Sequence, residues 1–95
     1  MARNGDDNSI PSTEVIADET AYRRYVDGEE RAANLLVEKY SDALTFYING
    51  YIRDMHEAED LMIEAFARIF AKERPLSSEG SFKAYLYKTA RHLAL

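Results

Sequence analysis

The fold of this chain is decided by residues 57–70, which read EAEDLMIEAFARIF. The bulky apolar side chains of this stretch recur at steps of three and four residues, the period of an α-helix with one buried face. The residues on that face are Leu61, Met62, Ala65, Phe66, Ile69 and Phe70. The residues on the outward face are Asp60, Ile63, Glu64, Ala67 and Arg68. The stretch is therefore predicted to be an amphipathic helix with an acidic outward face and one exposed aliphatic side chain.

The polar residues around this helix predict where it begins and where the next helix starts. Asp54 and Glu57 have the spacing of a capping box, in which both side chains accept hydrogen bonds from backbone amides of the first turn. A loop is expected over residues 74–80, bracketed by proline and glycine. Ser81 is the expected N-cap of a last helix.

The last helix is predicted to lie within the stretch SFKAYLYKTARHL, which begins at Ser81. Its inward side is expected to carry Phe82, Tyr85, Leu86, Thr89 and Leu93. At about 100° per residue, its outward arc is expected to carry Lys83, Tyr87, Lys88 and Arg91. This arc is basic with an interleaved aromatic ring, whereas the outward face of residues 57–70 is acidic.

The upstream half of the chain is also predicted to be helical after a tail. Residues 1–18 are polar and acidic, which predicts a flexible tail. A short helix capped by Thr20 is expected to stop at Gly28. A long helix with apolar residues at three- and four-residue steps is expected over residues 29–51, and no stretch alternates as a strand does. The chain is therefore predicted to be all-α, a small bundle of three to four helices over residues 19–95.

The charged residues are segregated along the chain, although the net charge of the whole is −5. Residues 1–67 carry six basic and fifteen acidic side chains, a net charge of −9. Residues 68–95 carry six basic and two acidic side chains, a net charge of +4. Such segregation is typical of a protein with separate surfaces for separate partners. On charge alone, a chance imbalance between helices explains it equally well.

Each of the two outward faces has a functional and a plain interpretation. The acidic face fits a docking surface for a basic helical partner with Ile63 as its apolar centre, or a solvated face with one stray aliphatic side chain. The basic arc fits a nucleic-acid strand, because Lys and Arg neutralise phosphates and Tyr87 can stack on an unpaired base. The alternative is a solvated basic face. Taken together, the two faces favour a protein that holds another protein while touching nucleic acid.

The sequence argues against catalysis, a metal site and a membrane span. It has no glycine-rich phosphate loop and no nucleophile beside a base, so neither an enzyme nor a catalytic residue is expected. His56, Glu59 and Asp60 have no second cluster to complete a metal site, and no cofactor is expected. No stretch approaches the roughly 18 apolar residues of a membrane span. The absence of cysteine fits a reducing cytoplasm.

Two motifs resemble those of bacterial extracytoplasmic-function (ECF) sigma factors. Residues 57–70 are similar to the family's D-A-E-D-L-V-Q-E-V-F-x-R-x-W stretch, and residues 81–95 to its F-R-x-W-L-Y-R-I-A-R-N-L-A-L segment. The residues from Gly28 to Leu44 resemble the family's first conserved helix. The resemblance covers residues 18–95, with both motifs in order and a loop between them. It implies the second conserved region of these factors, a small helical domain.

The resemblance implies a partner for each surface. In that family, one helix binds the clamp-helix coiled coil of the largest subunit of core RNA polymerase. The next helix and its preceding loop recognise and melt the minus-ten promoter element and hold its non-template strand. By position, the polymerase-binding residues would be Asp60, Ile63, Glu64, Ala67 and Arg68. The DNA-binding residues would be Ser77, Ser78, Glu79, Gly80, Lys83, Tyr87, Lys88, Arg91 and His92. An anti-sigma factor is a further expected partner.

Three positions depart from the family pattern. Ile63 stands where the family has Gln, Tyr85 where it has Trp, and His92 where it has Asn. The first and the last leave a second interpretation open, a sigma-like mimic that binds an anti-sigma factor without opening promoters. The chain also stops at Leu95 with no second helix-turn-helix domain, so we expect an excised domain. The favoured interpretation is the promoter-recognition and strand-melting domain of an alternative sigma factor.

Overall fold

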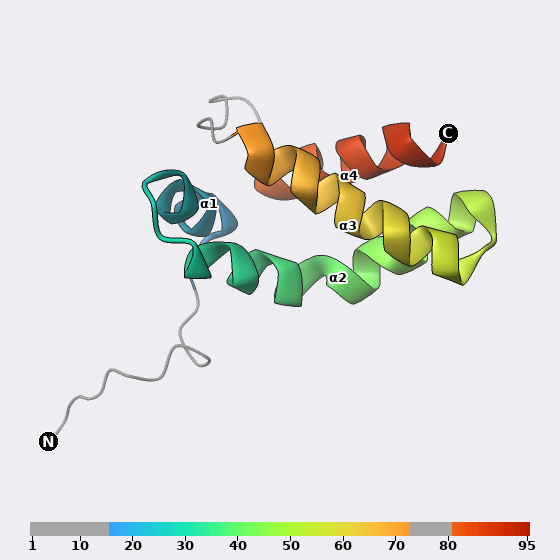
Figure 1. The fold of residues 1–95 in the computed structure, drawn as a ribbon, viewed down its shortest axis with the longest axis horizontal. Coiled ribbons are helices and arrows are strands. Elements are labelled where there is room, and N and C mark those ends of the chain that lie inside the picture. Colours follow the sequence, from blue (N-terminus) through green and yellow to red (C-terminus); the bar gives the residue numbers. More distant parts are fainter. Residues whose placement is uncertain (1–15, 73–80) are drawn as a thin grey trace, which may run out of the picture.

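The computed structural model describes residues 16–72 and 81–95, which form four helices. The helices are α1 (Asp18–Val26), α2 (Arg31–Ile52), α3 (Met55–Lys72) and α4 (Phe82–Ala94). α2 and α3 run side by side in opposite directions, and α4 packs against both (Figure 1). α1 packs at the end of the bundle where α2 begins and α3 ends (Figure 1). The described residues contain no strand, so the prediction of a small all-α bundle is confirmed.

The end of α1 depends on a glycine. Gly28 has a φ of +111°, a backbone conformation that residues with a side chain rarely adopt. Its N–H donates to the Tyr25 carbonyl at 2.9 Å, and the Glu29 N–H donates to the Arg24 carbonyl at 2.9 Å. These two bonds form a Schellman motif, which satisfies carbonyls that a helix end leaves without partners. The predicted stop at Gly28 is confirmed.

The start of α1 differs from the prediction. Thr20 lies inside the helix and is not its cap, because α1 begins at Asp18 and Ala17 occupies the cap position. No side chain caps this end, but Asp18 and Glu19 place negative charge in the first turn, where the helix dipole favours it. Of the tail expected over residues 1–18, positions up to 15 lie outside the described residues, while Asp18 belongs to α1.

A tight two-residue connection joins α2 to α3. Arg53 ends α2 in the left-handed conformation, with φ 58° and ψ 39°, and its N–H donates to the Asn49 carbonyl at 2.8 Å. Asp54 then begins α3, because its carboxylate accepts a hydrogen bond from the Glu57 N–H at 3.1 Å. The forward half of the predicted capping box is thus confirmed. The short connection fixes α3 antiparallel to α2.

The first turn of α4 is held from two directions. The Ser81 hydroxyl accepts a hydrogen bond from the Ala84 N–H at 3.1 Å, which confirms the predicted cap. The Glu19 carboxylate, on α1, accepts a second bond from the Phe82 N–H at 2.8 Å. This bond spans 63 positions of sequence, so it links the start of α4 directly to α1.

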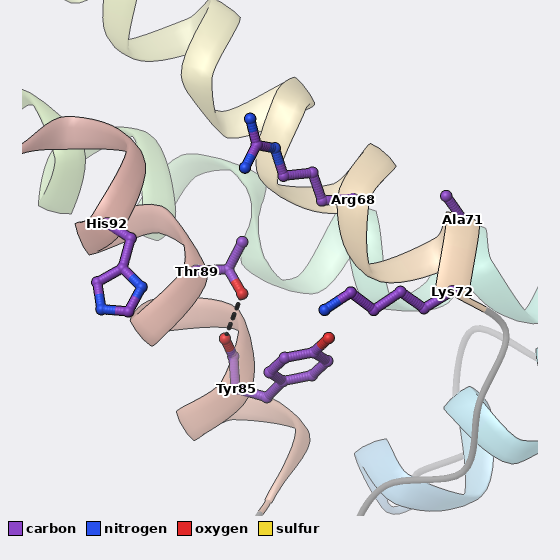
Figure 2. Close-up of a pocket in the computed structure, with 6 residues that line it drawn as sticks. All are labelled: Arg68, Ala71, Lys72, Tyr85, Thr89 and His92. Carbon is purple, nitrogen blue, oxygen red and sulfur yellow. Dashed lines mark hydrogen bonds between the residues drawn. The ribbon is translucent and has the colours of Figure 1, made fainter.

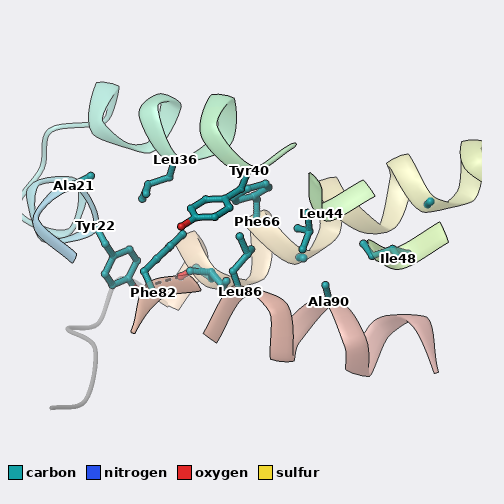
Figure 3. Packing of buried hydrophobic residues seen from close by; sticks show 13 residues of the cluster. Ala21, Tyr22, Leu36, Tyr40, Leu44, Ile48, Phe66, Phe82, Leu86 and Ala90 are labelled. Atoms are coloured by element: carbon teal, nitrogen blue, oxygen red, sulfur yellow. Dashed lines mark hydrogen bonds between the residues drawn. The ribbon is translucent and has the colours of Figure 1, made fainter. Parts of the chain in front are cut away.

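The core lies between α2, α3 and α4 and extends to α1 (Figure 3). Near the α1 end of the core the Phe82 ring, which is fully buried, contacts the rings of Tyr22 and Tyr40, with centroids 5.6 Å and 6.2 Å away. Small buried residues let the helices approach closely. The buried hydrophobic residues of the cluster are Ala21, Tyr22, Leu36, Tyr40, Leu44, Ile48, Ala58, Ala65, Phe66, Ile69, Phe82, Leu86 and Ala90.

Hydrogen bonds fasten α1 to the neighbouring helices. The Tyr25 hydroxyl donates to the Phe70 carbonyl of α3 at 3.1 Å. The Asp18 carboxylate accepts hydrogen bonds from the Lys39 ammonium at 2.8 Å and from the Tyr40 hydroxyl, both on α2. Because these bonds reach α3 and α2, and Glu19 reaches α4, α1 ties the three longer helices together at one end.

Candidate functional site

The outward face of α3 is exposed as predicted. Its five predicted residues, from Asp60 to Arg68, all lie on the solvent side of the helix. Ile63 is 61% exposed and has acidic residues on its own helix on either side, at Asp60 and Glu64. An aliphatic side chain this exposed gains stability only when a partner covers it. The structure therefore leaves an apolar residue within an acidic surface.

One ion pair lies on this face. The Arg68 guanidinium donates to the Glu64 carboxylate at 3.0 Å, one helical turn away, and both side chains are about half exposed. Exposed pairs of this spacing contribute only about 0.3–0.5 kcal/mol to stability. Both charges are therefore available to a partner at little cost to the fold.

The neighbouring helices divide the surface of α4 into an outer arc and two flanks. Lys83, Lys88, Arg91 and His92 are exposed, as predicted for DNA-binding residues. Lys83 lies at the edge of this arc that meets α2, and His92 lies at the edge that meets α3. The remaining predicted DNA-binding positions, Ser77, Ser78, Glu79 and Gly80, lie outside the described residues.

The α2 flank carries Tyr87, and here the prediction needs correction. Tyr87 was expected on the outward arc, but it is half-buried. Its ring contacts those of Tyr47 and Tyr40 on α2, with centroids 4.8 Å and 6.4 Å away. Tertiary packing explains why Tyr87 is half-buried, because α2 lies against this flank of α4. The Lys83 ammonium lies 5.9 Å from the centre of the Tyr87 ring, so the flank still joins an aromatic ring to a cation.

The α3 flank borders a cavity of about 440 Å³ (Figure 2). The residues that line it are Arg68, Ala71, Lys72, Tyr85, Thr89 and His92. The Lys72 ammonium lies 5.7 Å from the centre of the Tyr85 ring. The Thr89 hydroxyl donates back to the Tyr85 carbonyl at 2.9 Å and is thus satisfied within α4 (Figure 2). The cavity combines a ring face with cationic side chains, which suits a flat ligand that carries negative charge.

The cavity brings together residues that the sequence motifs assign to different surfaces. Arg68 belongs to the predicted polymerase-binding set and His92 to the predicted DNA-binding set, yet both line this cavity. Lys72 and Tyr85 belong to neither set. The sequence indicated Tyr85 through the spacing of Tyr85, Thr89 and His92, which places the three on one side of a helix. Only the position of α3 shows that this side faces a cation-bearing helix.

Two tyrosines between helices have raised pKa values. Burial raises the pKa of Tyr40 above the ordinary value of 10.0, and the hydrogen bond to Asp18 and the charge of that carboxylate raise it further. The hydrogen bond with Tyr51 raises the pKa of Tyr47, as does burial, while the positive charge of Arg91 acts in the opposite direction. Both phenols are therefore neutral at ordinary pH, and Arg91 is close enough to Tyr47 to affect it.

Neither a metal centre nor a membrane span is found in the described ranges. Residues 16–72 and 81–95 contain no group of three His, Cys, Asp or Glu side chains placed to hold a metal ion. In the same ranges, no helix combines the length and the apolar character needed to cross a membrane. The features with chemical character in this part of the chain are thus the charged faces and the aromatic clusters.

Comparison with known proteins identifies the family. The family model described as Sigma-70 region 2 matches residues 36–95, which include most of α2 and all of α3 and α4. The match covers more than half of the chain. This chain therefore belongs to the sigma-70 region 2 family.

Two curated relatives agree with that membership. The RNA polymerase sigma-H factor of Pseudomonas aeruginosa is 30% identical over 77 residues, which are 81% of this chain and 40% of that protein. The ECF RNA polymerase sigma-E factor of Haemophilus influenzae is 25% identical over 81 residues, which are 85% of this chain and 42% of that protein. The chain thus spans about two fifths of the length of the curated relatives it matches. No solved structure matches significantly.

Proposed function

We propose that this chain is the part of a sigma factor that binds core RNA polymerase and the minus-ten promoter element and so directs transcription initiation. The observation that carries the proposal is family membership together with two exposed surfaces of opposite charge on consecutive helices. The chain performs no chemical step. It contributes binding energy to strand opening, which the polymerase holoenzyme carries out in the cytoplasm.

The outward face of α3 is the proposed surface for polymerase, and the partner is the clamp-helix coiled coil of the largest subunit. Ile63 is its apolar anchor, because a large exposed fraction can be buried there and the surrounding charges can exclude water. Asp60 and Glu64 would steer a basic partner into place. The ion pair between Glu64 and Arg68 is exposed, so the partner can rearrange it.

The surface of α4 is the proposed binding site for the non-template strand of the minus-ten element. Lys83, Lys88 and Arg91 are exposed and spread along the helix, as a strand with evenly spaced phosphates requires. The cavity between α3 and α4 would accept one unpaired base, with the Tyr85 ring as stacking partner and Lys72 beside it. An acidic chain can bind DNA in this way because polymerase contributes most of the cationic channel.

A titration against the isolated clamp-helix coiled coil of bacterial RNA polymerase tests the proposal. Glu64→Lys reverses one charge on the outward face of α3. Asp42→Lys is a matched control, because Asp42 is also an exposed acid but lies on α2. We expect the parent chain and the Asp42 variant to bind with the same affinity. The Glu64 variant should lose at least about tenfold, since a like charge then faces the basic partner.

The outcome can contradict the proposal in two ways. If a folded sample shows no saturable binding at high micromolar concentration, polymerase is not the partner of this face. If the variants of Glu64 and Asp42 lose affinity equally, binding depends on overall charge and not on the outward face of α3. Circular dichroism of each variant establishes that the comparison is made between folded proteins.

The exposure of Ile63 favours a second candidate function, a sigma-like module that binds an anti-sigma factor without opening promoters. An apolar side chain in place of a polar one fits a drier partner surface. Lys88→Glu with Arg91→Glu separates the two candidates. This change should abolish promoter binding in the polymerase complex if the first function holds. It should leave the binding of an anti-sigma factor largely intact in the second.

A further inference from the structure

Three tyrosines form a row that leads from the α2 flank of α4 onto α2. The ring centroids of Tyr87 and Tyr47 are 4.8 Å apart with an angle of 66° between the rings. Those of Tyr47 and Tyr51 are 5.5 Å apart with an angle of 75°. Both contacts have the edge-to-face geometry that aromatic pairs prefer. We refer to Tyr87, Tyr47 and Tyr51 as the tyrosine row.

The tyrosine row is anchored in the core at one end and open to solvent at the other. Tyr87 contacts the buried ring of Tyr40. Tyr47 and Tyr87 are half-buried, and Tyr51 is 45% exposed. Rings held in this way by their neighbours lose little conformational freedom when a flat ligand stacks on them. The row is therefore a preorganised aromatic surface.

The hydroxyl groups of the tyrosine row differ from those of the tyrosines that hold the fold. The hydroxyls of Tyr25 and Tyr40 each donate to an acceptor on another helix. The hydroxyls of Tyr47 and Tyr51 lie 3.5 Å apart on α2, and in the described part of the chain each has only the other as a hydrogen-bond partner. The hydroxyls of Tyr47 and Tyr51 thus join no two helices.

Positive charge borders the tyrosine row on α4. The Lys83 ammonium lies 5.9 Å from the centre of the Tyr87 ring. Arg91 is exposed, and its charge opposes the rise in the pKa of Tyr47. Proteins that bind single strands combine such cations, which contact the backbone, with aromatic rings on which the bases stack. Aromatic rings alone would fit many ligands, but rings bordered by cations favour a polyanion with flat groups.

We propose that the tyrosine row is a stacking platform for unpaired bases of single-stranded DNA, with Lys83 and Arg91 binding the adjacent phosphates. The proposal rests on the proposed function, because it extends the DNA-binding surface of α4 onto α2. Every base presents a flat π face, so the platform accepts any base sequence. The residues that this adds to the binding surface and that neither sequence motif includes are Tyr47 and Tyr51.

Fluorescence anisotropy with the whole 95-residue chain tests this. The probes are a labelled oligothymidine strand and an abasic strand of the same length, which keeps the phosphates but offers no base. Tyr51→Ala removes the exposed ring. Phe46→Ala is a matched control, because Phe46 is an aromatic residue of the same helix, 65% exposed, and points about 140° away from Tyr51. Tyr51→Phe keeps the ring and removes only the hydroxyl.

We expect Tyr51→Ala to weaken binding of oligothymidine by about tenfold, the lower part of the range for one stacked base. Binding of the abasic strand should not change, and Tyr51→Phe and Phe46→Ala should bind both strands as the parent does. If Tyr51→Ala lowers the folded fraction, Tyr51→Leu gives the same test, because it keeps apolar bulk without a ring. Equal losses for both strands would overturn the proposal, since the ring would then not act by stacking.

The result also separates failure of the platform from failure of the proposed function. The platform alone is wrong if Tyr51→Ala changes nothing while Lys88→Glu with Arg91→Glu abolishes binding of both strands. If the parent chain binds neither strand, the platform is wrong, whereas the proposed function is tested independently by the titration against the clamp-helix coiled coil. Loss of affinity in Phe46→Ala equal to that in Tyr51→Ala would also overturn the platform, because the effect would then belong to α2 as a whole.

Discussion

α1 and the outward face of α3 use charged side chains for opposite purposes. On α1, Asp18 binds Lys39 and Tyr40 of α2, and Glu19 binds the backbone of α4. On α3, Glu64 pairs with a residue of its own helix. Within residues 16–72 and 81–95, the side-chain hydrogen bonds that join two helices all involve α1. One region therefore holds the bundle together, while the other leaves its charges available.

This difference indicates which residues serve the fold and which serve a partner. A carboxylate that bonds to another helix cannot turn to a ligand without loosening the bundle. A carboxylate paired one turn away on an exposed face can do so at little cost. Variants of α1 should therefore lower the stability of the domain, and variants of the outward face of α3 should lower binding with little effect on stability.

The largest effect on stability is expected from Tyr22→Ala on α1. Tyr22 is 2% exposed, and its ring contacts the buried ring of Phe82. Truncation of a buried aromatic side chain costs about 3–5 kcal/mol, which is a large part of the stability of a small domain. Urea denaturation should show the loss. Phe46→Ala, which truncates an exposed ring, should change stability by no more than about 0.5 kcal/mol. If Tyr22→Ala and Phe46→Ala lose the same stability, the conclusion that α1 holds the bundle together is contradicted.

A smaller loss is expected from Glu19→Ala, which removes the bond from α1 to the start of α4. Hydrogen bonds to charged groups contribute about 1.5–3 kcal/mol, and this partly exposed bond should lie at or below the lower end. Glu19→Gln keeps an acceptor and should recover part of the stability. Thermal unfolding followed by circular dichroism measures both. A Glu19→Ala variant as stable as the parent would show that this bond does not hold α4 to α1.

The bond between Tyr40 and Asp18 should make stability depend on alkaline pH. The folded pKa of Tyr40 is raised, chiefly by burial and then by Asp18, so its contribution is present below the unfolded pKa of about 10 and is lost as pH rises towards the folded pKa. Tyr40→Phe should cost about 1 kcal/mol at neutral pH. Denaturation at about pH 8 and about pH 11 should show the parent losing this advantage. If the difference in stability between the parent and Tyr40→Phe is the same at both pH values, the linkage between Tyr40 ionisation and folding is excluded.

The smallest effect on stability is expected on the outward face of α3. Glu64→Ala breaks the exposed pair with Arg68 and should lower the unfolding free energy by about 0.5 kcal/mol or less. Differential scanning calorimetry should place its melting temperature close to that of the parent. A loss as large as that of Glu19→Ala would mean that this face also holds the fold.

The features that the sequence predicts correctly are local ones. The end of α1 at Gly28 and the caps at Asp54 and Ser81 depend on residues within a few positions, so spacing is enough to find them. The outward face of α3 can be derived from the period of a single helix. Thr20 was misplaced because α1 begins without a capping side chain, at a residue that binds α2.

The features that the sequence could not predict depend on which helices meet. The period of α4 placed Tyr87 outward, but α2 covers that flank and holds the ring against Tyr47. Tyr85, which the period of this helix placed inward, packs against the core, but the cavity beside Lys72 that it also lines could not be predicted. The bond from Glu19 to α4 joins residues 63 positions apart, and no periodicity indicates it.

The central claim, that two faces serve two partners, is tested most directly by a crossed titration. Glu64→Lys and the double variant Lys88→Glu with Arg91→Glu are each titrated against the clamp-helix coiled coil and against single-stranded DNA. We predict that Glu64→Lys loses the coiled coil and keeps DNA, and that the double variant loses DNA and keeps the coiled coil. If either variant, while folded, loses both partners to the same extent, the surfaces are not separate and the account is wrong.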